Sequence, residues 1–153
     1  STRNTTIAAG WRGSTATVSI GYRRTTTREA GREDVAKGLE IRAQMFGGES
    51  VERAFAPQDP LTQKFQKLIT SSCFGQVWAD GSVPLSDRSL MTLSILGAQQ
   101  RFQQFELHAK LARKNGCTRE QLIEVVQHLT VYCGVPTGGE AYRILSSMLA
   151  EDA

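Results

Sequence analysis

The distribution of apolar residues predicts a chain built from amphipathic helices. From Arg32 onward, apolar side chains recur every three or four residues, the spacing that aligns them on one face of an α-helix. The first such helix has apolar residues at Val35, Leu39 and Met45. Gly47 and Gly48 are expected to break it, and residues 51–55 are expected to form a short turn.

Asp59 and Pro60 predict the start of a second helix, because aspartate is a favourable N-cap and proline fits the first helical position. We expect this helix to run through Phe65 and Leu68 towards Trp78.

A loop at residues 79–84 is expected to separate it from a third helix, which Ser86 and Asp87 would cap. The third helix is apolar on most sides, which predicts a buried central element. Its apolar positions are Leu90, Leu93, Ile95, Leu96 and Gly97.

Two further helices are expected to meet at a tight corner. Asn115–Gly116 predicts the end of the first, because glycine readily takes the left-handed conformation of a helix C-terminus. Thr118 and Gln121 have the spacing of a capping box that opens the second, and Pro136 predicts that it ends near residue 133. The second helix has core-like residues at Leu122, Val125, Val126, Leu129 and Tyr132. A final helix is expected over residues 137–149.

The chain's only two histidines lie on these two consecutive helices. His108 shares the apolar face of Phe105, whereas His128 shares a face with Glu124 and Tyr132, each four residues away. Two interpretations are open. Either each imidazole is satisfied by a backbone group in a core or interface, or the imidazoles move protons, since this side chain titrates near neutral pH.

One helical domain is expected, because 153 residues of which 40% are hydrophobic suffice for a single core. No apolar run approaches the roughly 20 residues of a membrane span, so no membrane association is expected. Cys73, Cys117 and Cys133 show no metal-ligand spacing and are too few and odd in number for a disulfide framework. We therefore expect no metal site, a reducing, cytoplasmic location and a buried Cys133.

The formal net charge of +3 belongs to an N-terminal extension, residues 1–28, which holds five arginines and no acid. The helical domain, residues 29–153, is slightly acidic. Within the extension, Thr15–Tyr22 alternates like a strand. The open alternatives are a disordered segment, sequence upstream of the true start, an arm that pairs with a neighbouring subunit, or an organelle-targeting segment. Nucleic acid is not an expected partner, because these arginines lack an aromatic platform and a recognisable motif.

The helical domain contains several short motifs, each of which occurs once. They are Phe74–Trp78, Arg88–Leu96, Phe105-x-x-His108 followed by Ala112 and Asn115–Gly116, Thr118 followed by Leu122 and Glu124, and Tyr132-x-Gly134-x-Pro136. Together they cover about residues 33–150 and resemble the carboxymuconolactone decarboxylase family. The resemblance implies an all-α, alkyl hydroperoxidase D-like subunit of about six helices. It also implies a ring-shaped assembly, commonly a homohexamer arranged as a trimer of dimers.

The related alkyl hydroperoxidase D proteins carry a Cys-x-x-Cys pair where this chain has Arg101 and Gln104. Without paired thiols, disulfide-cycling peroxidase chemistry of that kind is not expected. An isolated Cys133 leaves a weaker alternative, a thiol-dependent hydroperoxidase-like oxidoreductase.

The family resemblance implies a decarboxylase, a lyase of aromatic catabolism that acts on 4-carboxymuconolactone or a related small-molecule carboxylate. Such a lactone carries its own electron sink, so no cofactor is expected. The protein would supply carboxylate anchors, hydrogen-bond donors for the developing oxyanion and an acid that protonates carbon. His108 is the first candidate for this acid. His128 is the candidate for polarising the lactone carbonyl, with Glu124 or Tyr132 setting its tautomer.

Arg88 and Arg101 are candidates for the carboxylate clamp, because a guanidinium group can donate two hydrogen bonds at once. Arg101 is favoured because it matches the first thiol position of the peroxidase branch. Trp78 and Phe74 are expected to line the pocket, although aromatic residues at this spacing are also typical of a core.

Two departures from the family pattern bear on the reaction. Gln104 stands where members close to the type enzyme tend to carry a glutamate, and the acid Glu106 follows on a different helical face. Residues 137–139 are also unusually rich in glycine, which predicts a reshaped subunit contact or pocket edge. A non-catalytic assembly or binding protein with the same fold is therefore the main alternative.

Overall fold

The computed structural model describes residues 27–56 and 59–151. Its elements are α1 (Thr27–Phe46), α2 (Gly48–Phe55), α3 (Pro60–Ile69), the π-helix η1 (Thr70–Trp78), α4 (Leu85–Ala98), α5 (Phe102–Lys114), α6 (Arg119–Cys133) and α7 (Val135–Glu151). The predicted all-α class is confirmed, since the described residues form helices and no strand. The strand-like pattern predicted for 15–22 lies outside these residues.

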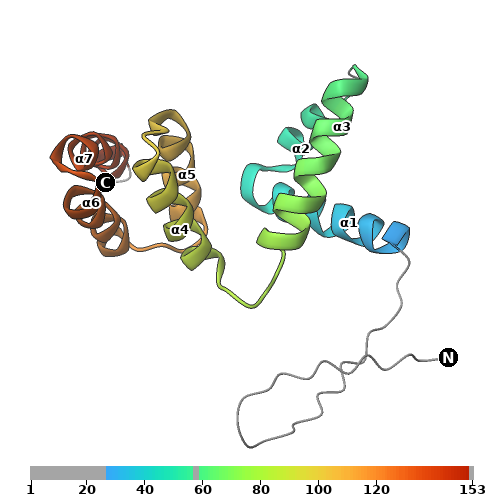
Figure 1. Ribbon diagram of the computed structural model, residues 1–153, viewed down its shortest axis with the longest axis horizontal. Helices are drawn as coiled ribbons and strands as arrows, with labels where there is room; N and C mark the ends of the chain where they lie inside the picture. Colours follow the sequence, from blue (N-terminus) through green and yellow to red (C-terminus); the bar gives the residue numbers. More distant parts are fainter. Residues whose placement is uncertain (1–26, 57–58, 152–153) are drawn as a thin grey trace, which may run out of the picture.

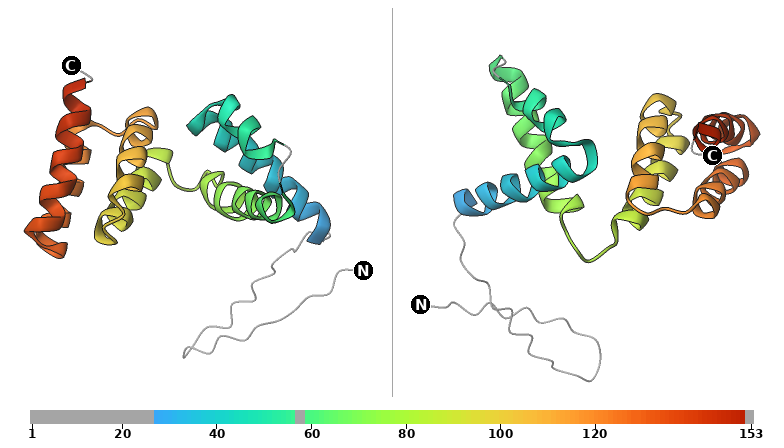
Figure 2. Two further views of the ribbon diagram at one scale, coloured as in Figure 1. Left: turned by 90° about the horizontal axis from the view of Figure 1, so that it is seen from above. Right: turned by 180° about the vertical axis from the view of Figure 1, so that it is seen from behind.

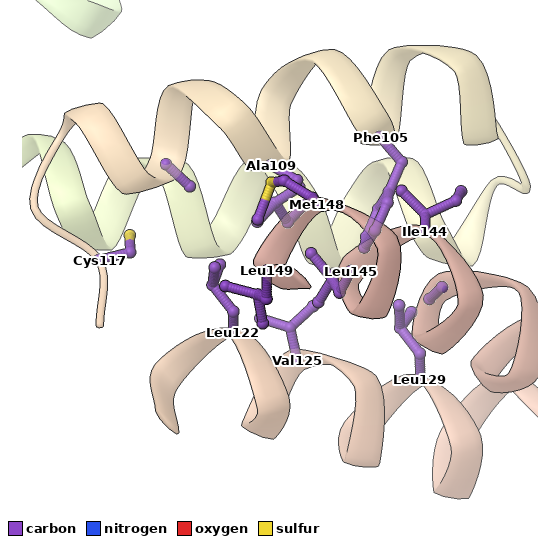
Figure 3. Close-up of a cluster of buried hydrophobic side chains, with 13 residues drawn as sticks. Phe105, Ala109, Cys117, Leu122, Val125, Leu129, Ile144, Leu145, Met148 and Leu149 are labelled. Atoms are coloured by element: carbon purple, nitrogen blue, oxygen red, sulfur yellow. The ribbon is translucent and has the colours of Figure 1, made fainter. Parts of the chain in front are cut away.

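The helices form two groups, joined by the segment that follows Trp78 (Figures 1 and 2). The first group contains α1, α2, α3 and η1, and the second contains α4 to α7. The main hydrophobic core lies within the second group (Figure 3). Its largest fully buried side chains are Phe105, Leu93 and Leu122. The second group therefore has a core of its own.

The first group is held together by close contact of α1 with η1. A β-carbon on Gly38 would collide with the carbonyl oxygen of Thr70, and one on Gly75 would collide with that of Asp34. The two backbones therefore approach closely at two points, and at each point one of the two helices has a glycine. After Ile69 the chain departs from α-helical geometry and continues as a π-helix, a form that is rare and concentrated at functional sites.

A smaller cluster of apolar side chains connects the two groups, and we call it the seam cluster. It consists of buried Met45, Trp78 and Leu111, with Ile41, Phe46, Phe74 and Leu85 packed against them. Lys114 Nζ adds a polar link by donating a hydrogen bond to the carbonyl oxygen of Met45 at 3.1 Å.

Local sequence signals located several helix ends correctly. Asp59 caps α3 by accepting hydrogen bonds from two backbone N–H groups, with proline in the first turn. The capping box of Thr118 and Gln121 opens α6, and Gly116 has a φ of 94° after the end of α5. The predicted end of α6 is confirmed at Cys133.

Other boundaries differ from the prediction. Residues 51–55 belong to helix α2 rather than to a turn. Helix α4 begins at Leu85 after Pro84, so Ser86 and Asp87 lie inside its first turn and do not cap it. Helix α7 begins at Val135, because a proline in a first helical turn removes no intrahelical hydrogen bond.

Three predictions of burial were wrong. Ile95, Tyr132 and Cys133 are exposed rather than packed in a core. Helical spacing correctly assigns residues to one face, but a face is buried only where another element covers it. No helix among the described residues is both long and apolar enough to cross a membrane.

Candidate functional site

His108 lies on α5 at the seam between the two groups of helices. Its imidazole is half-buried against Trp78, with ring centroids 6.5 Å apart and planes inclined at 33°. Burial lowers the pKa of His108 below its usual value. The imidazole is therefore kept neutral near pH 7 in the free protein, ready to take up a proton when an anion arrives.

The π-helical geometry of η1 positions Trp78 for this contact. The N–H of Ala79 donates to the carbonyl oxygen of Phe74 at 2.8 Å, a hydrogen bond across five residues. This wider turn places Trp78 on the buried side together with Gly75, while the ring of Phe74 meets Phe46 edge to face. The two aromatic residues predicted to line a pocket thus belong to the seam cluster.

Arg88 is a second polar group near the seam. Its side chain is 9% exposed, and Nη2 donates to the carbonyl oxygen of Asp80, two residues after Trp78, at 2.8 Å. The carboxylate of Asp80 is 3.9 Å from Nη2, and its oxygen Oδ1 accepts the N–H of Ser82 at 2.9 Å. That hydrogen bond is the main reason why the pKa of Asp80 is lowered.

The Nε–H of Arg88 is buried without a hydrogen-bond partner. A buried donor that lacks a partner is costly, so this guanidinium is suited to receive an anion. We call His108, Trp78, Asp80 and Arg88 the seam site.

Gln104 lies on the face of α5 that carries His108, four residues before it, and Arg101 lies seven residues before His108. Both are exposed, and Arg101 is the residue that precedes the first turn of α5. Glu106 lies on a different face, where it pairs with Lys110 at 3.5 Å. With Arg143 it borders a small depression between α5 and α7, away from Trp78.

A buried arginine that the sequence analysis did not single out lies in the first group. Arg42 is 9% exposed and lies over the rings of Phe55 and Phe74, at 5.6 and 5.3 Å from their centroids. Nη1 donates to Gln66 at 3.0 Å and to Thr70 at 2.7 Å. Burial lowers its pKa, and no carboxylate among the described residues pairs with it. Its sequence signal was its position, three residues after Leu39 and three before Met45, on the apolar stripe of α1.

His128 lies elsewhere, in a groove of about 500 Å³ between α4 and α6. Its Nδ1 lies 3.0 Å from the carbonyl oxygen of Glu124, which can only accept, so Nδ1 carries the proton and Nε2 is free to accept. The carboxylate of Glu124 is 3.9 Å away, and the ring of Tyr132 stacks at 5.9 Å. The predicted grouping of these three residues is therefore present, on an exposed surface.

The structure thus separates the predicted residues into two places. His108, Trp78 and Arg88 lie at the seam, whereas His128, Glu124 and Tyr132 lie in the α4–α6 groove and have other neighbours. Cys133 also lines this groove.

Two of the thiols and the arrangement of the acidic side chains bear on other kinds of chemistry. Burial raises the pKa of the thiols of Cys73 and Cys117, which disfavours the thiolate form. Within the described residues, no three His, Cys, Asp or Glu side chains are grouped as metal ligands would be.

Comparisons with known proteins agree with this helical framework. Residues 63–146 match the sequence profile of the carboxymuconolactone decarboxylase family. The chain is 29% identical to 4-carboxymuconolactone decarboxylase of Acinetobacter baylyi over 115 residues, which are 75% of this chain and 86% of that protein. It is 35% identical to nitrosuccinic acid decarboxylase of Metarhizium robertsii over 116 residues, which are 76% of this chain and 81% of that protein. Both relatives are named as decarboxylases.

Proposed function

Because the chain belongs to the carboxymuconolactone decarboxylase family, we propose that it decarboxylates a dicarboxylate in which the electron pair left by carbon dioxide can be delocalised onto an electron-accepting group, directly or through a double bond. The compounds after which the two relatives are named both fit this description. Carboxymuconolactone carries a lactone carbonyl, and nitrosuccinic acid carries a nitro group, beside two carboxylates. Either 4-carboxymuconolactone or a compound of this wider class is the proposed substrate.

The proposed reaction places all of its electron flow in the substrate. The carbon–carbon bond to one carboxylate breaks, carbon dioxide leaves, and the electron pair is delocalised onto the lactone or nitro oxygen. The resulting anion is then protonated on carbon. Since the electron sink belongs to the substrate, the protein has to supply an anion anchor and a proton donor.

The seam site contains both kinds of group. Arg88 offers a buried guanidinium with an unpartnered N–H for a substrate carboxylate. His108, neutral in the free protein, would be protonated more readily once a dianion binds beside it, and it would then give this proton to carbon. The observation that carries the proposal is that both groups contact one segment at this boundary: His108 packs against Trp78, and Arg88 binds the carbonyl oxygen of Asp80, two residues later.

The test is a direct assay of carbon dioxide release from freshly prepared carboxymuconolactone and, separately, from nitrosuccinate. We expect turnover of one compound by the native protein and a loss of roughly 10²- to 10⁴-fold in His108→Ala, the usual effect of removing a general acid. Gln103→Ala is the matched control, because Gln103 is exposed on the same helix, five residues before His108. Undiminished turnover in His108→Ala would remove this residue from the mechanism. No release from either compound by the native protein would contradict the proposed substrate class.

A second candidate, a non-catalytic assembly protein, is favoured by Gln104, which shares the face of His108 but cannot act as an acid. The surface also favours self-association. Large apolar side chains are exposed on α3, α4, α6 and α7, and contiguous exposed apolar surface is typical of interaction sites. A homo-oligomer, in line with the hexamer that the family resemblance implies, is therefore proposed for either function.

A further inference from the structure

Helix α3 carries an apolar face that nothing in its own chain covers. Leu61, Phe65 and Leu68, at positions i, i+4 and i+7, are 78%, 57% and 60% exposed. No residue of α3 is buried, although its opposite side contacts α1 through the hydrogen bond between Gln66 and Arg42. A row of large exposed apolar side chains is typical of an interaction site, so this face is expected to be covered.

The groove between α4 and α6 is a matching unfilled surface. Leu90, Val125 and Leu129 lie at its base, and Tyr132, which is 80% exposed, lies along its rim. Apolar side chains provide most of its lining. An apolar helix face with this spacing is the kind of element that such a groove accepts.

The two surfaces do not meet within the described chain. In every view of Figures 1 and 2, α3 packs with α1 and α2, while α4 and α6 belong to the other group of helices. A second copy is therefore required to bring an α3 face to this groove.

Charge distinguishes this groove from the other apolar groove of the second helix group. Lys64 borders the α3 face, one residue before Phe65 and four before Leu68. The α4–α6 groove contains the carboxylate of Glu124, whereas the groove between α6 and α7 contains the cationic side chain of Arg119. A lysine at the edge of the helix face is attracted by the first groove and repelled by the second.

We propose that α3 of one copy docks into the α4–α6 groove of a second copy, with Lys64 facing Glu124 of the partner subunit. This contact would also cover Tyr132 and His128, which are exposed in the single chain. It rests on the self-association proposed above and is independent of the decarboxylation reaction.

Cys133 allows a direct test, because this native thiol is exposed and lines the groove. Two full-length chains with tags of different size are co-expressed in a Cys73→Ser background. One carries Phe65→Cys and Cys133→Ser, and the other keeps Cys133. After mild oxidation, we expect a disulfide-linked heterodimer on a non-reducing gel.

Lys67→Cys in place of Phe65→Cys is the matched control, because position 67 is exposed on the side of α3 away from its apolar face. We expect at least a tenfold lower heterodimer yield from this control. Adding Glu124→Lys to the second chain should also lower the yield from Phe65→Cys. Equal yields from positions 65 and 67 would overturn the proposal.

Light scattering on the native protein measures its oligomeric state, which separates failure of the proposed surfaces from absence of self-association. An oligomer that gives no heterodimer through position 65 would overturn the proposed surfaces but not self-association. A monomer at micromolar concentration would overturn both. Neither outcome bears on the carbon dioxide assay, so failure of the reaction is detected separately.

Discussion

At the scale of single residues, the seam site contains two side chains whose surroundings differ from those of ordinary surface groups. Arg88 is buried with an unpartnered Nε–H, and His108 is half-buried beside Trp78. Each group is more favourable when an anion is present, Arg88 because it gains an acceptor and His108 because its protonated form is stabilised. Binding of a dianion and protonation of His108 are therefore expected to be coupled.

This coupling predicts a specific pH dependence. Burial lowers the pKa of His108 below its usual value of about 6.5, so the protonated form of the free enzyme is lost as the pH rises through that lowered pKa. At pH values above the lowered pKa of His108, we expect kcat/KM to fall about tenfold per pH unit. The bound dianion raises the pKa of His108, so kcat should fall only at higher pH than kcat/KM does.

Steady-state rates between pH 5 and 8.5 provide the measurement. In Gln103→Ala, kcat/KM and kcat should both still fall as the pH rises. The residual activity of His108→Ala should not show these decreases. A native kcat/KM that stays constant over this range would show that His108 does not titrate in the rate-limiting protonation.

At the scale of helices, the sequence predicted those features that depend on neighbouring residues. Asp59 and the pair Thr118 and Gln121 located the starts of α3 and α6, because a cap is a short-range hydrogen-bonding arrangement. Tyr132 was assigned to the core wrongly, because periodicity identifies a face and not the element that covers it. The π-helix was not predicted, and neither was the close contact of its Gly75 with Asp34 of α1, because such a contact joins residues far apart in the sequence.

In the candidate site too, features set by neighbouring residues could be predicted, whereas those set by the packing of distant helices could not. The choice of His108 and Arg88 as candidates rests on local patterns and on the family resemblance, and their roles stay predictions. The separation of His128 from His108 could not, because it depends on how α6 packs against α4. Arg42 was not predicted, because the sequence does not show whether a charged residue on an apolar stripe is buried without a carboxylate partner.

Two adjacent glycines in α7 make a prediction about helix packing. A β-carbon on Gly138 would lie 2.7 Å from Cα of Thr130, whereas one on Gly139 would meet nothing within 4 Å. Gly138→Ala should therefore destabilise the protein by about 1–3 kcal/mol, the usual cost of overpacking. Gly139→Ala should stabilise it by roughly 0.5–1 kcal/mol, since alanine favours the helix.

Urea denaturation monitored by circular dichroism measures both effects, and Gly139→Ala serves as the control for helix propensity. Equal effects of the two substitutions would contradict the close approach of α6 and α7. The glycine-rich residues 137–139 would then be better explained by a reshaped subunit contact, as the sequence alone suggested.

At the scale of the whole molecule, the chain is two groups of helices held together by the seam cluster. The second group has its own core, whereas the first depends on the contact of α1 with η1 and on the seam cluster. Groups that differ in this way are expected to open with different free energies. The seam site lies at the boundary, so its geometry depends on both groups remaining in contact.

Trp78→Ala tests this organisation, because Trp78 is the largest side chain of the seam cluster. Removing a buried tryptophan costs about 3–5 kcal/mol, which a domain of ordinary stability can survive. Amide hydrogen exchange, followed by mass spectrometry, should accelerate by at least tenfold in α1 and η1 and much less in α6 and α7. Met148→Ala, in the core of the second group, should show the opposite distribution. Equal acceleration in both groups of Trp78→Ala would mean that the chain opens as one cooperative unit, and the seam would then be an internal part of a single core rather than a boundary.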